Sequence, residues 1–283
     1  EKYTDDVYEI IRQYVVVKQT EERGETIKPG EYPKAFRPST PRFFRITCDN
    51  GKERDIASVP LYPDQIVHQI LILAGKSIFM RGMYSRSCGS IPHRGTHYGK
   101  RYLARSIKRA AENRPASIKY AAQLDITKCY PHVDHAKLKE TLRKKFRGKI
   151  FVWLCYDIID SYTDALPGEA PRGIPIGFVT SQWFCNFLLT PLDHHIKETL
   201  GISCYVRYMD DMILFDRNKK HLHSVVKNIA DKAAEYGFHI KDNWQVFRFD
   251  YIAKHELGKD GKTKHRGRAI DFLGFRFFRD KTI

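Results

Sequence analysis

The most informative stretch of the sequence is YVRYMDDMILF, residues Tyr205 to Phe215. Two apolar runs flank the adjacent carboxylates Asp210 and Asp211, so this stretch predicts two short strands joined by a tight turn. Aspartate is disfavoured within a strand pair, and two like charges in apolar surroundings are costly. A turn that served only to reverse the chain would usually carry Gly or Asn, whereas this one has Met on both sides. A divalent cation would remove the repulsion and explain the acidic pair.

A second strand with an acidic end supplies a third carboxylate. The strand Ala121 to Ile126 carries Asp125 and leads into a helix over 136–146, for which Asp134 is the expected N-cap. Taken alone, Asp125 would be an ordinary strand-end residue. Its interpretation therefore depends on where the fold places this strand.

The order of the remaining elements brings the acids together. A helix is predicted over 222–236 and a strand over 238–240. With the long helix that begins at Thr180 as an added layer, the order is β-α-β-β-α-β, the split βαβ arrangement. In this arrangement the strand of Asp125 lies beside the hairpin, so Asp125 and Asp210 can hold the same ions. Two Mg²⁺ ions, with Mn²⁺ as an alternative, would suit phosphoryl transfer.

The net charge of the chain points to a polyanionic partner. Lys and Arg total 49 against 33 Asp and Glu, a formal net charge of +16 at pH 7. A globular chain this basic repels itself, which favours nucleic acid as a partner over a merely solvated basic surface. A basic helix over 99–113 and the run Arg143 to Arg147 are expected to contact a nucleic-acid backbone. The alternative for both is a charged face in solvent.

Cysteine usage and hydropathy exclude several classes. Six cysteines are scattered without a CxxC pair, which argues against a zinc knuckle or a disulfide scaffold and for a reducing compartment. No apolar run is long enough to cross a bilayer, and no signal peptide is visible. The expected location is cytoplasmic, without a membrane partner.

The amino-terminal part carries fewer local signals. Two short strands, 42–46 and 54–56, are predicted to form a hairpin around the turn Asp49-Asn50-Gly51. Pro63 and Asp64 then open a helix. The rest of residues 1–60 is mixed in pattern, and a less regular stretch follows the helix that ends at 146.

Five segments resemble sequence motifs of reverse transcriptases, in the order in which those enzymes carry them. The segments are Arg54 to His97 (the amino-terminal fingers blocks of bacterial enzymes), Leu124 to Tyr130 (motif A), Gly173 to Gly177 with Thr180-Ser181-Gln182 and Asn186 (motif B), Tyr208 to Asp211 (motif C, the YMDD motif) and Phe272 to Phe275 (motif E, the primer grip). The ordered set is far more specific than any single box.

This resemblance implies an α+β fold with fingers (1–117) and a palm (118–283) that has a fingers-side insertion around 147–172. The palm would be a ferredoxin-like split βαβ antiparallel sheet with helices on one face, and the helical thumb of the family would be absent from this chain. The implied activity is that of an RNA-directed DNA polymerase, a nucleotidyltransferase that adds dNTPs to a primer. Its partners would be a template RNA, the primer, the cDNA product and dNTPs.

The resemblance also implies roles for single residues. Asp125, Asp210 and Asp211 would be the catalytic metal ligands. Tyr130 would be the steric gate whose ring occupies the space of a ribose 2′-hydroxyl. The other implied contacts are Lys52, Arg54, Ile176, Gly177 and Gln182 with the incoming dNTP, and Phe272, Leu273 and Gly274 with the primer.

Two departures from the common motifs bear on which group of reverse transcriptases the chain resembles. Ile176 stands where retroviral and group II intron enzymes usually carry Gln, and Ser181-Gln182 stands where introns and retrons carry Ser-Pro. This pattern resembles the enzymes of diversity-generating retroelements, which copy a template RNA with errors at adenines and work with a small basic accessory protein. In the motif D region, Trp244 takes the place of a proton-donating Lys, and Lys241 is expected to be solvated.

Three alternatives remain from the sequence. One is a reverse transcriptase of a phage-defence or other unclassified bacterial retroelement. Another is an RNA-dependent RNA polymerase, against which Tyr130 argues. The third is a catalytically inactive relative that binds nucleic acid, against which the intact Asp125, Asp210 and Asp211 argue.

Overall fold

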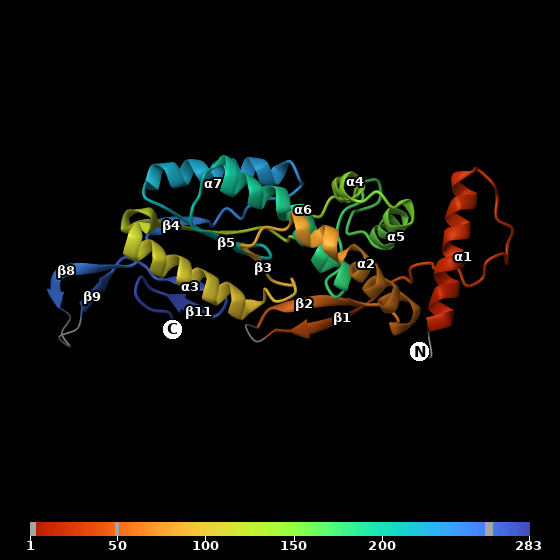
Figure 1. Cartoon of the computed structure of the whole chain (residues 1–283), viewed down its shortest axis with the longest axis horizontal. Coiled ribbons are helices and arrows are strands. Elements are labelled where there is room, and N and C mark those ends of the chain that lie inside the picture. The colour runs from red at the N-terminus through yellow and green to blue at the C-terminus, as the bar shows by residue number, and fades with distance from the viewer. Residues whose placement is uncertain (1–3, 49–50, 258–262) are drawn as a thin grey trace. The chain divides into compact units, whose positions relative to one another are not determined.

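The computed structural model describes residues 4–48, 51–257 and 263–283 (Figure 1). The chain divides into two compact units, each built from two separate segments. Unit 1 comprises Glu1–Gly82 and Tyr130–Cys185, and unit 2 comprises Met83–Cys129 and Asn186–Ile283. The predicted fingers and palm are functional subdomains with other boundaries and remain a prediction.

Unit 1 is mainly helical. Its elements are α1 (Thr4–Glu22), β1 (Arg42–Thr47), β2 (Glu53–Ser58), the helical turn η1 (Leu61–Gln65), α2 (Ile66–Gly82), α4 (His135–Lys145), α5 (Lys149–Asp160) and the first part of α6 (Val179–His194). The strands β1 and β2 form the predicted antiparallel hairpin, with Arg42 opposite Ser58. Residues Asp49 and Asn50 of its predicted turn lie outside the described residues.

The helix α4 begins as the sequence predicts, because Asp134 accepts a hydrogen bond from the Lys137 amide at 3.0 Å. Helices α1 and α5 were not predicted. They pack on each other through Asp157 of α5, which accepts hydrogen bonds from the Tyr14 hydroxyl at 2.9 Å and from Lys18 Nζ at 3.0 Å. The stretch expected to be irregular therefore contains a helix that is held by tertiary contacts.

Unit 2 consists of a sheet with a layer on each face. Its elements are β3 (Ser87–Cys88), α3 (Thr96–Asn113), η2 (Pro115–Ile118), β4 (Tyr120–Asp125), the end of α6, η3 (His195–Thr199), β5 (Tyr205–Tyr208), β6 (Asp211–Asp216), α7 (Lys219–Ala234), β7 (Gln245–Arg248), β8 (Tyr251–Leu257), β9 (Thr263–Arg266), β10 (Ile270–Phe272) and β11 (Phe275–Phe277). The main sheet has the strand order β3-β5-β6-β4-β7.

The four strands β5, β6, β4 and β7 have the predicted split βαβ topology, since β4 pairs antiparallel with both β6 and β7. Two details differ from the prediction. The edge strand β3 was not predicted, and it pairs parallel with β5, so the sheet is mixed. The strand expected at 238–240 is reduced to one bridge between Ile240 and Ile126, and the fourth strand is β7. A turn in which the Trp244 amide bonds the Lys241 carbonyl separates the bridge from β7.

Different layers cover the two faces of this sheet. Helix α7 contacts β4, β6 and β7 on one side, and Figure 1 shows α3 on the opposite side. Leu103 and Ile107 of α3 share a buried cluster with Val206 and Ile213 of the sheet and with Phe272 of the β10–β11 hairpin. The alternation of side chains along a strand then places Arg207 and Met212 on the other face, toward α6 and α7.

Candidate active site

The acidic turn between β5 and β6 is a two-residue hairpin loop. Tyr208 pairs with Asp211, which leaves Met209 and Asp210 as the loop residues. Met209 has a φ of 53°, a left-handed conformation that favours Gly in such loops. A side chain held there costs roughly 1–3 kcal/mol, and strain of this kind gathers at functional sites. The turn is therefore held in place by its surroundings.

The fold places Asp125 beside this turn. Asp125 pairs in register with Asp211 across β4 and β6, and the next residue, Ile126, donates its amide to the Asp210 carbonyl at 3.3 Å. The three acids predicted from distant segments of the sequence thus lie at one end of two neighbouring strands. Their role as metal ligands remains a prediction.

The surroundings of Asp125 fit a cation site. Within the described part of the chain, Asp125 Oδ1 is buried and has no hydrogen-bond partner. Its Oδ2 pairs with Lys241 Nζ, and the Lys241 amide bonds the Asp125 carbonyl at 2.8 Å. A cavity of about 240 Å³ opens beside it and is lined by Gln123, Leu124, Asp125, Asp211, Asn243, Gln245 and Arg268. An unsatisfied buried carboxylate oxygen at the strand end that also carries Asp211 offers the kind of oxygen ligand that Mg²⁺ prefers.

Lys241 is a site residue that the sequence analysis missed. It was expected to be solvated, whereas its ammonium group contacts Asp125. The signal was weak, because Lys241 is one of many lysines, and contacts between distant segments, among them the bridge between Ile126 and Ile240, bring it to the end of β4.

The residues predicted to contact the dNTP lie in unit 1. Lys52 and Arg54 are exposed on the β1–β2 hairpin, and Gln182 is half-buried on α6. The Ile176 carbonyl accepts a hydrogen bond from the Ala57 amide at 2.7 Å, so motif B is joined to the strand that carries Arg54. Gly177 makes this approach possible, because its φ is 121° and a Cβ atom would lie 2.2 Å from the Ala57 carbonyl oxygen.

Tyr130, the predicted steric gate, is anchored through its backbone. Its carbonyl accepts a hydrogen bond from the Ile174 amide at 3.0 Å, in the segment just before Ile176. The tyrosine and residues 173–182 of motif B are therefore parts of one compact unit. The gate function itself remains a prediction.

The predicted primer grip is a second tight hairpin loop. Leu273 and Gly274 connect β10 and β11 with φ values of 58° and 79°. Phe272 is buried, and the Leu273 side chain packs so closely on Gly99 of α3 that a Cβ atom there would lie 2.7 Å from it. A cavity of about 610 Å³ borders this loop. The loop is thus rigidly supported, while its contact with a primer remains a prediction.

The basic helix predicted over 99–113 is α3, and most of its basic side chains are exposed. Gly99, Leu103 and Ile107 form the buried face of α3, and the exposed face carries Arg101, Arg105, Lys108 and Arg109. The run Arg143 to Arg147 is also exposed apart from Phe146. In the described residues, no helix is both long and apolar enough to span a membrane.

A buried histidine beside motif B predicts acid sensitivity. His68 of α2 packs edge-on against Phe178, with ring centroids 4.9 Å apart, and burial lowers its pKa from 6.5 to about 4. Between pH 6.5 and 4 the unfolded state binds more protons, so stability falls as the pH falls through this window. We expect a loss on the order of 3 kcal/mol in the free energy of unfolding, and His68→Gln should remove that pH dependence.

Urea denaturation at a series of pH values would measure this effect. The exposed His93 serves as the control, and His93→Asn should leave the slope unchanged, since Asn tolerates the positive φ at this position. An equal acid response in wild type and His68→Gln would contradict the assignment.

Comparison with known proteins supports the fold. Residues 49–277 match the family described as reverse transcriptase (RNA-dependent DNA polymerase). No curated protein matches the sequence. Similar solved structures include telomerase from Candida albicans in complex with a fragment of telomeric RNA, at a TM-score of 0.57 and 16% identity over 86% of this chain and 45% of that one.

Telomerase from Candida tropicalis is also similar in structure. A form truncated from its C-terminal domain has a TM-score of 0.58 at 16% identity, over 86% of this chain and 54% of that chain. The apo form has a TM-score of 0.57 at 14% identity and covers 98% of this chain and 52% of that one. The chain spans about half the length of these structures, and at such identities the likeness shows the fold alone. Because the family match covers most of its length, the chain belongs to the reverse transcriptase (RNA-dependent DNA polymerase) family.

Proposed function

We propose that the chain extends a primer with dNTPs on an RNA template. The observation that carries this proposal is the convergence of Asp125 with Asp210 and Asp211 at one end of the sheet, where Asp125 Oδ1 is buried without a partner among the described residues. Family membership and the net charge of +16 support it.

The three acids would hold two Mg²⁺ ions, or Mn²⁺ in their place. Such ions would supply positive charge that lowers the pKa of a 3′-hydroxyl and neutralises a triphosphate. The chain's own residues would do the rest. Lys52 and Arg54 would bind the triphosphate, since an Arg side chain can donate two hydrogen bonds to phosphate. Tyr130 would exclude a 2′-hydroxyl by occupying its space.

The nucleic acid would be bound by charge and by the second hairpin loop. The exposed arginines and lysines of α3 are suited to phosphate contacts that do not depend on sequence and weaken with salt. Leu273 and Gly274, at the tip of the rigid β10–β11 hairpin, would hold the primer end.

A primer-extension assay tests this function. The purified protein with Mg²⁺ should extend a DNA primer on an RNA template with dNTPs and should use rNTPs far less well. Extension with rNTPs at an equal rate would make the protein an RNA polymerase. If neither nucleotide is incorporated on any primed template, the protein is a binding relative without the chemistry.

We further propose that the enzyme belongs to a diversity-generating retroelement and works with a small basic accessory protein. Ile176 and the Ser181-Gln182 pair support this proposal. The Ile176 carbonyl accepts the Ala57 amide, and the side chain of residue 176 is apolar, so neither offers a hydrogen bond to a base pair.

An apolar residue 176 predicts low fidelity at adenine. We expect more misincorporation opposite template adenines than opposite other bases, and Ile176→Gln should reduce it by roughly tenfold, because a polar side chain restores hydrogen-bond discrimination. Sequencing of cDNA made from one RNA template measures both quantities, with Ile174→Val as a control for repacking in the same segment. Equal error rates at all four bases would exclude this retroelement class and favour another bacterial one.

A further inference from the structure

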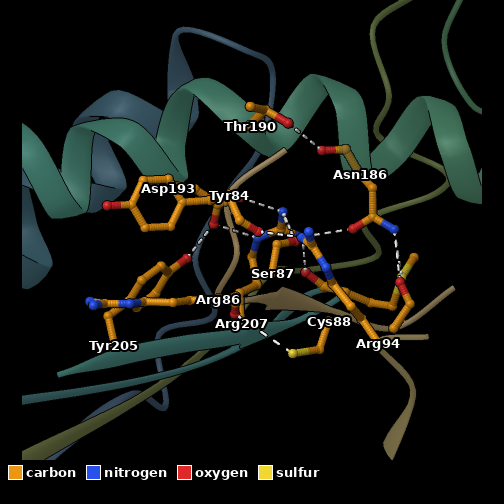
Figure 2. A network of polar contacts seen from close by, with 12 residues as sticks. Tyr84, Arg86, Ser87, Cys88, Arg94, Asn186, Thr190, Asp193, Tyr205 and Arg207 are labelled. Atoms are coloured by element: carbon orange, nitrogen blue, oxygen red, sulfur yellow. Dashed lines mark hydrogen bonds and ion pairs between the residues drawn. The ribbon is translucent and has the colours of Figure 1, made fainter. Parts of the chain in front are cut away.

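An arginine behind the acidic turn is fully buried and uses every hydrogen-bond donor it has. Arg207 of β5 and Asp193 of α6 are both 0% exposed and form an ion pair at 2.6 Å. Arg207 Nε donates to Asp193 Oδ1 at 2.8 Å. Its Nη1 donates to Asn186 Oδ1 at 3.0 Å and to the Met209 carbonyl at 2.8 Å, and its Nη2 donates to Ser87 Oγ at 2.7 Å and to Asp193 Oδ2 at 2.6 Å. Figure 2 shows Arg207 between Asp193 and Asn186 of α6 and Ser87 of β3.

Asp193 lies beside His194 near the end of α6, is fully buried, and also accepts a hydrogen bond from the Tyr205 hydroxyl at 2.6 Å. All of these residues belong to unit 2.

Stability alone does not explain such a network. Burying two charges costs a large desolvation energy, and apolar residues of similar volume often stabilise a protein as well or better. A buried ion pair is better suited to selecting one conformation among several. The question is therefore which conformation this one selects.

The contacts converge on Met209, the residue that precedes Asp210. Arg207 binds its carbonyl, the Cys88 carbonyl accepts its amide at 3.1 Å, and Asn186 Nδ2 donates to its sulfur at 3.3 Å. Asn186 Nδ2 also donates to the Gly89 carbonyl at 3.0 Å, and a Cβ atom on Gly89 would lie 2.9 Å from Met209 Cγ. Both backbone polar groups and the side chain of Met209 are thus fixed at a φ of 53°.

We propose that Arg207, with Asn186 and Asp193, is a positioning unit that holds the strained Met209 backbone and thereby aims the Asp210 carboxylate at the metal ions. The unit is fully buried and would act from the face of the sheet opposite to Asp125, without contact to nucleotide or metal. The same unit explains the short edge strand β3, which supplies Ser87 as an acceptor for Arg207 and the Cys88 carbonyl as an acceptor for the Met209 amide. The inference rests on the proposed polymerase function.

Two variants separate positioning from stability. Arg207→Lys keeps a positive charge beside Asp193, but a compact ammonium group with three donors cannot reach Asp193, Asn186, Ser87 and the Met209 carbonyl together. The triple variant Arg207→Met, Asp193→Leu, Tyr205→Phe removes the buried charges and the hydroxyl that would lose its partner, so its fold should survive. The matched control is Lys232→Met with Glu235→Leu, which removes a 2.6 Å ion pair on the exposed side of α7 in the same unit.

The readouts are the thermal midpoint, kcat and KM for the dNTP per folded molecule, and Mn²⁺ binding followed by electron paramagnetic resonance with a 3′-deoxy-terminated primer. Both variants leave buried acceptors without a donor, so we expect thermal midpoints below the wild-type value. Per folded molecule, we expect a kcat lower by about 100-fold, as for a group misplaced by about 1 Å, and a KM within about twofold. The dissociation constant of Mn²⁺ should rise by about tenfold, and replacing Asp210 itself by Asn should raise it as well. The control pair should match wild type.

Either variant would overturn the proposal if its folded molecules kept the wild-type kcat and Mn²⁺ affinity, since the network would then serve only folding. The proposal would also fail if activity fell only in proportion to the fraction of molecules that are folded. Failure of the proposed function looks different, because wild type itself would then extend no primer. In that case the Mn²⁺ titration still tests whether Arg207 positions Asp210.

Discussion

Replacing Asp210 by Asn is expected to lower kcat for nucleotide addition by at least about 1000-fold, because a neutral amide cannot neutralise a divalent cation at the point where charge develops. The change keeps the shape of the side chain, so the hairpin loop and its Met209 backbone should persist. The thermal midpoint should therefore stay near the wild-type value. Single-turnover primer extension with Mg²⁺ would measure the loss.

The other acidic end of the same strand offers a matched control. Asp216 is the last residue of β6, at the end of the strand away from the acidic turn. Its Oδ2 lies 2.8 Å from His221 Nδ1. Asp216→Asn makes the same chemical change and should keep nearly full activity. If Asp210→Asn extended primers as fast as Asp216→Asn, the acidic turn would not be the catalytic centre.

Adding one methyl group at Gly177 should have the second largest effect. The φ of 121° is strained for any residue with a Cβ atom, and this atom would lie 2.2 Å from the Ala57 carbonyl oxygen. The obstacle is backbone, so no side-chain rotation can relieve it, and the hydrogen bond from Ala57 to Ile176 should break. We expect Gly177→Ala to destabilise unit 1 by roughly 2–4 kcal/mol and to lower kcat/KM for the dNTP by at least about tenfold.

Two other glycines of unit 1 calibrate this result. A Cβ atom on Gly148 would meet only Phe151 Cβ at 3.8 Å, and Gly148→Ala should be close to neutral. Gly173 combines a φ of 92° with a contact to the Asp164 side chain, which can move, so Gly173→Ala should fall in between. Urea denaturation and dNTP titration on the three variants would show this order. Equal behaviour of Gly177→Ala and Gly148→Ala would contradict a tight joint between motif B and the β1–β2 hairpin.

Local patterns were enough to predict the elements that carry the acids. The apolar runs around Asp210 and the strand before Asp125 give clear signals, and the split βαβ order then fixes their adjacency, as the Asp125–Asp211 register confirms. Asp134 also caps its helix as predicted, because capping depends on neighbours in the sequence. The elements themselves depend on short-range patterns, and the order of the elements supplies their pairing.

The missed features depend on contacts between distant segments. The strand β3 has two residues and no periodic signal, and it forms because it pairs with β5. Helix α5 follows Gly148 without a side-chain cap and is held by α1. One sequence signal could have predicted the buried Arg207–Asp193 pair. Each of these opposite charges stands alone next to apolar residues, Arg207 in YVRYM and Asp193 in the helix that begins near Thr180.

The most direct test of the proposed polymerase centre is to look for metal ions there. A crystal of the protein with an RNA template, a 3′-deoxy-terminated primer, the next dNTP and Mn²⁺ should show two anomalous peaks, each bound by carboxylate oxygens of Asp125 and Asp210. The oxygen Asp125 Oδ1, which has no partner among the described residues, should be a ligand of at least one ion. Density for the dNTP with no Mn²⁺ between Asp125 and Asp210 would contradict the account.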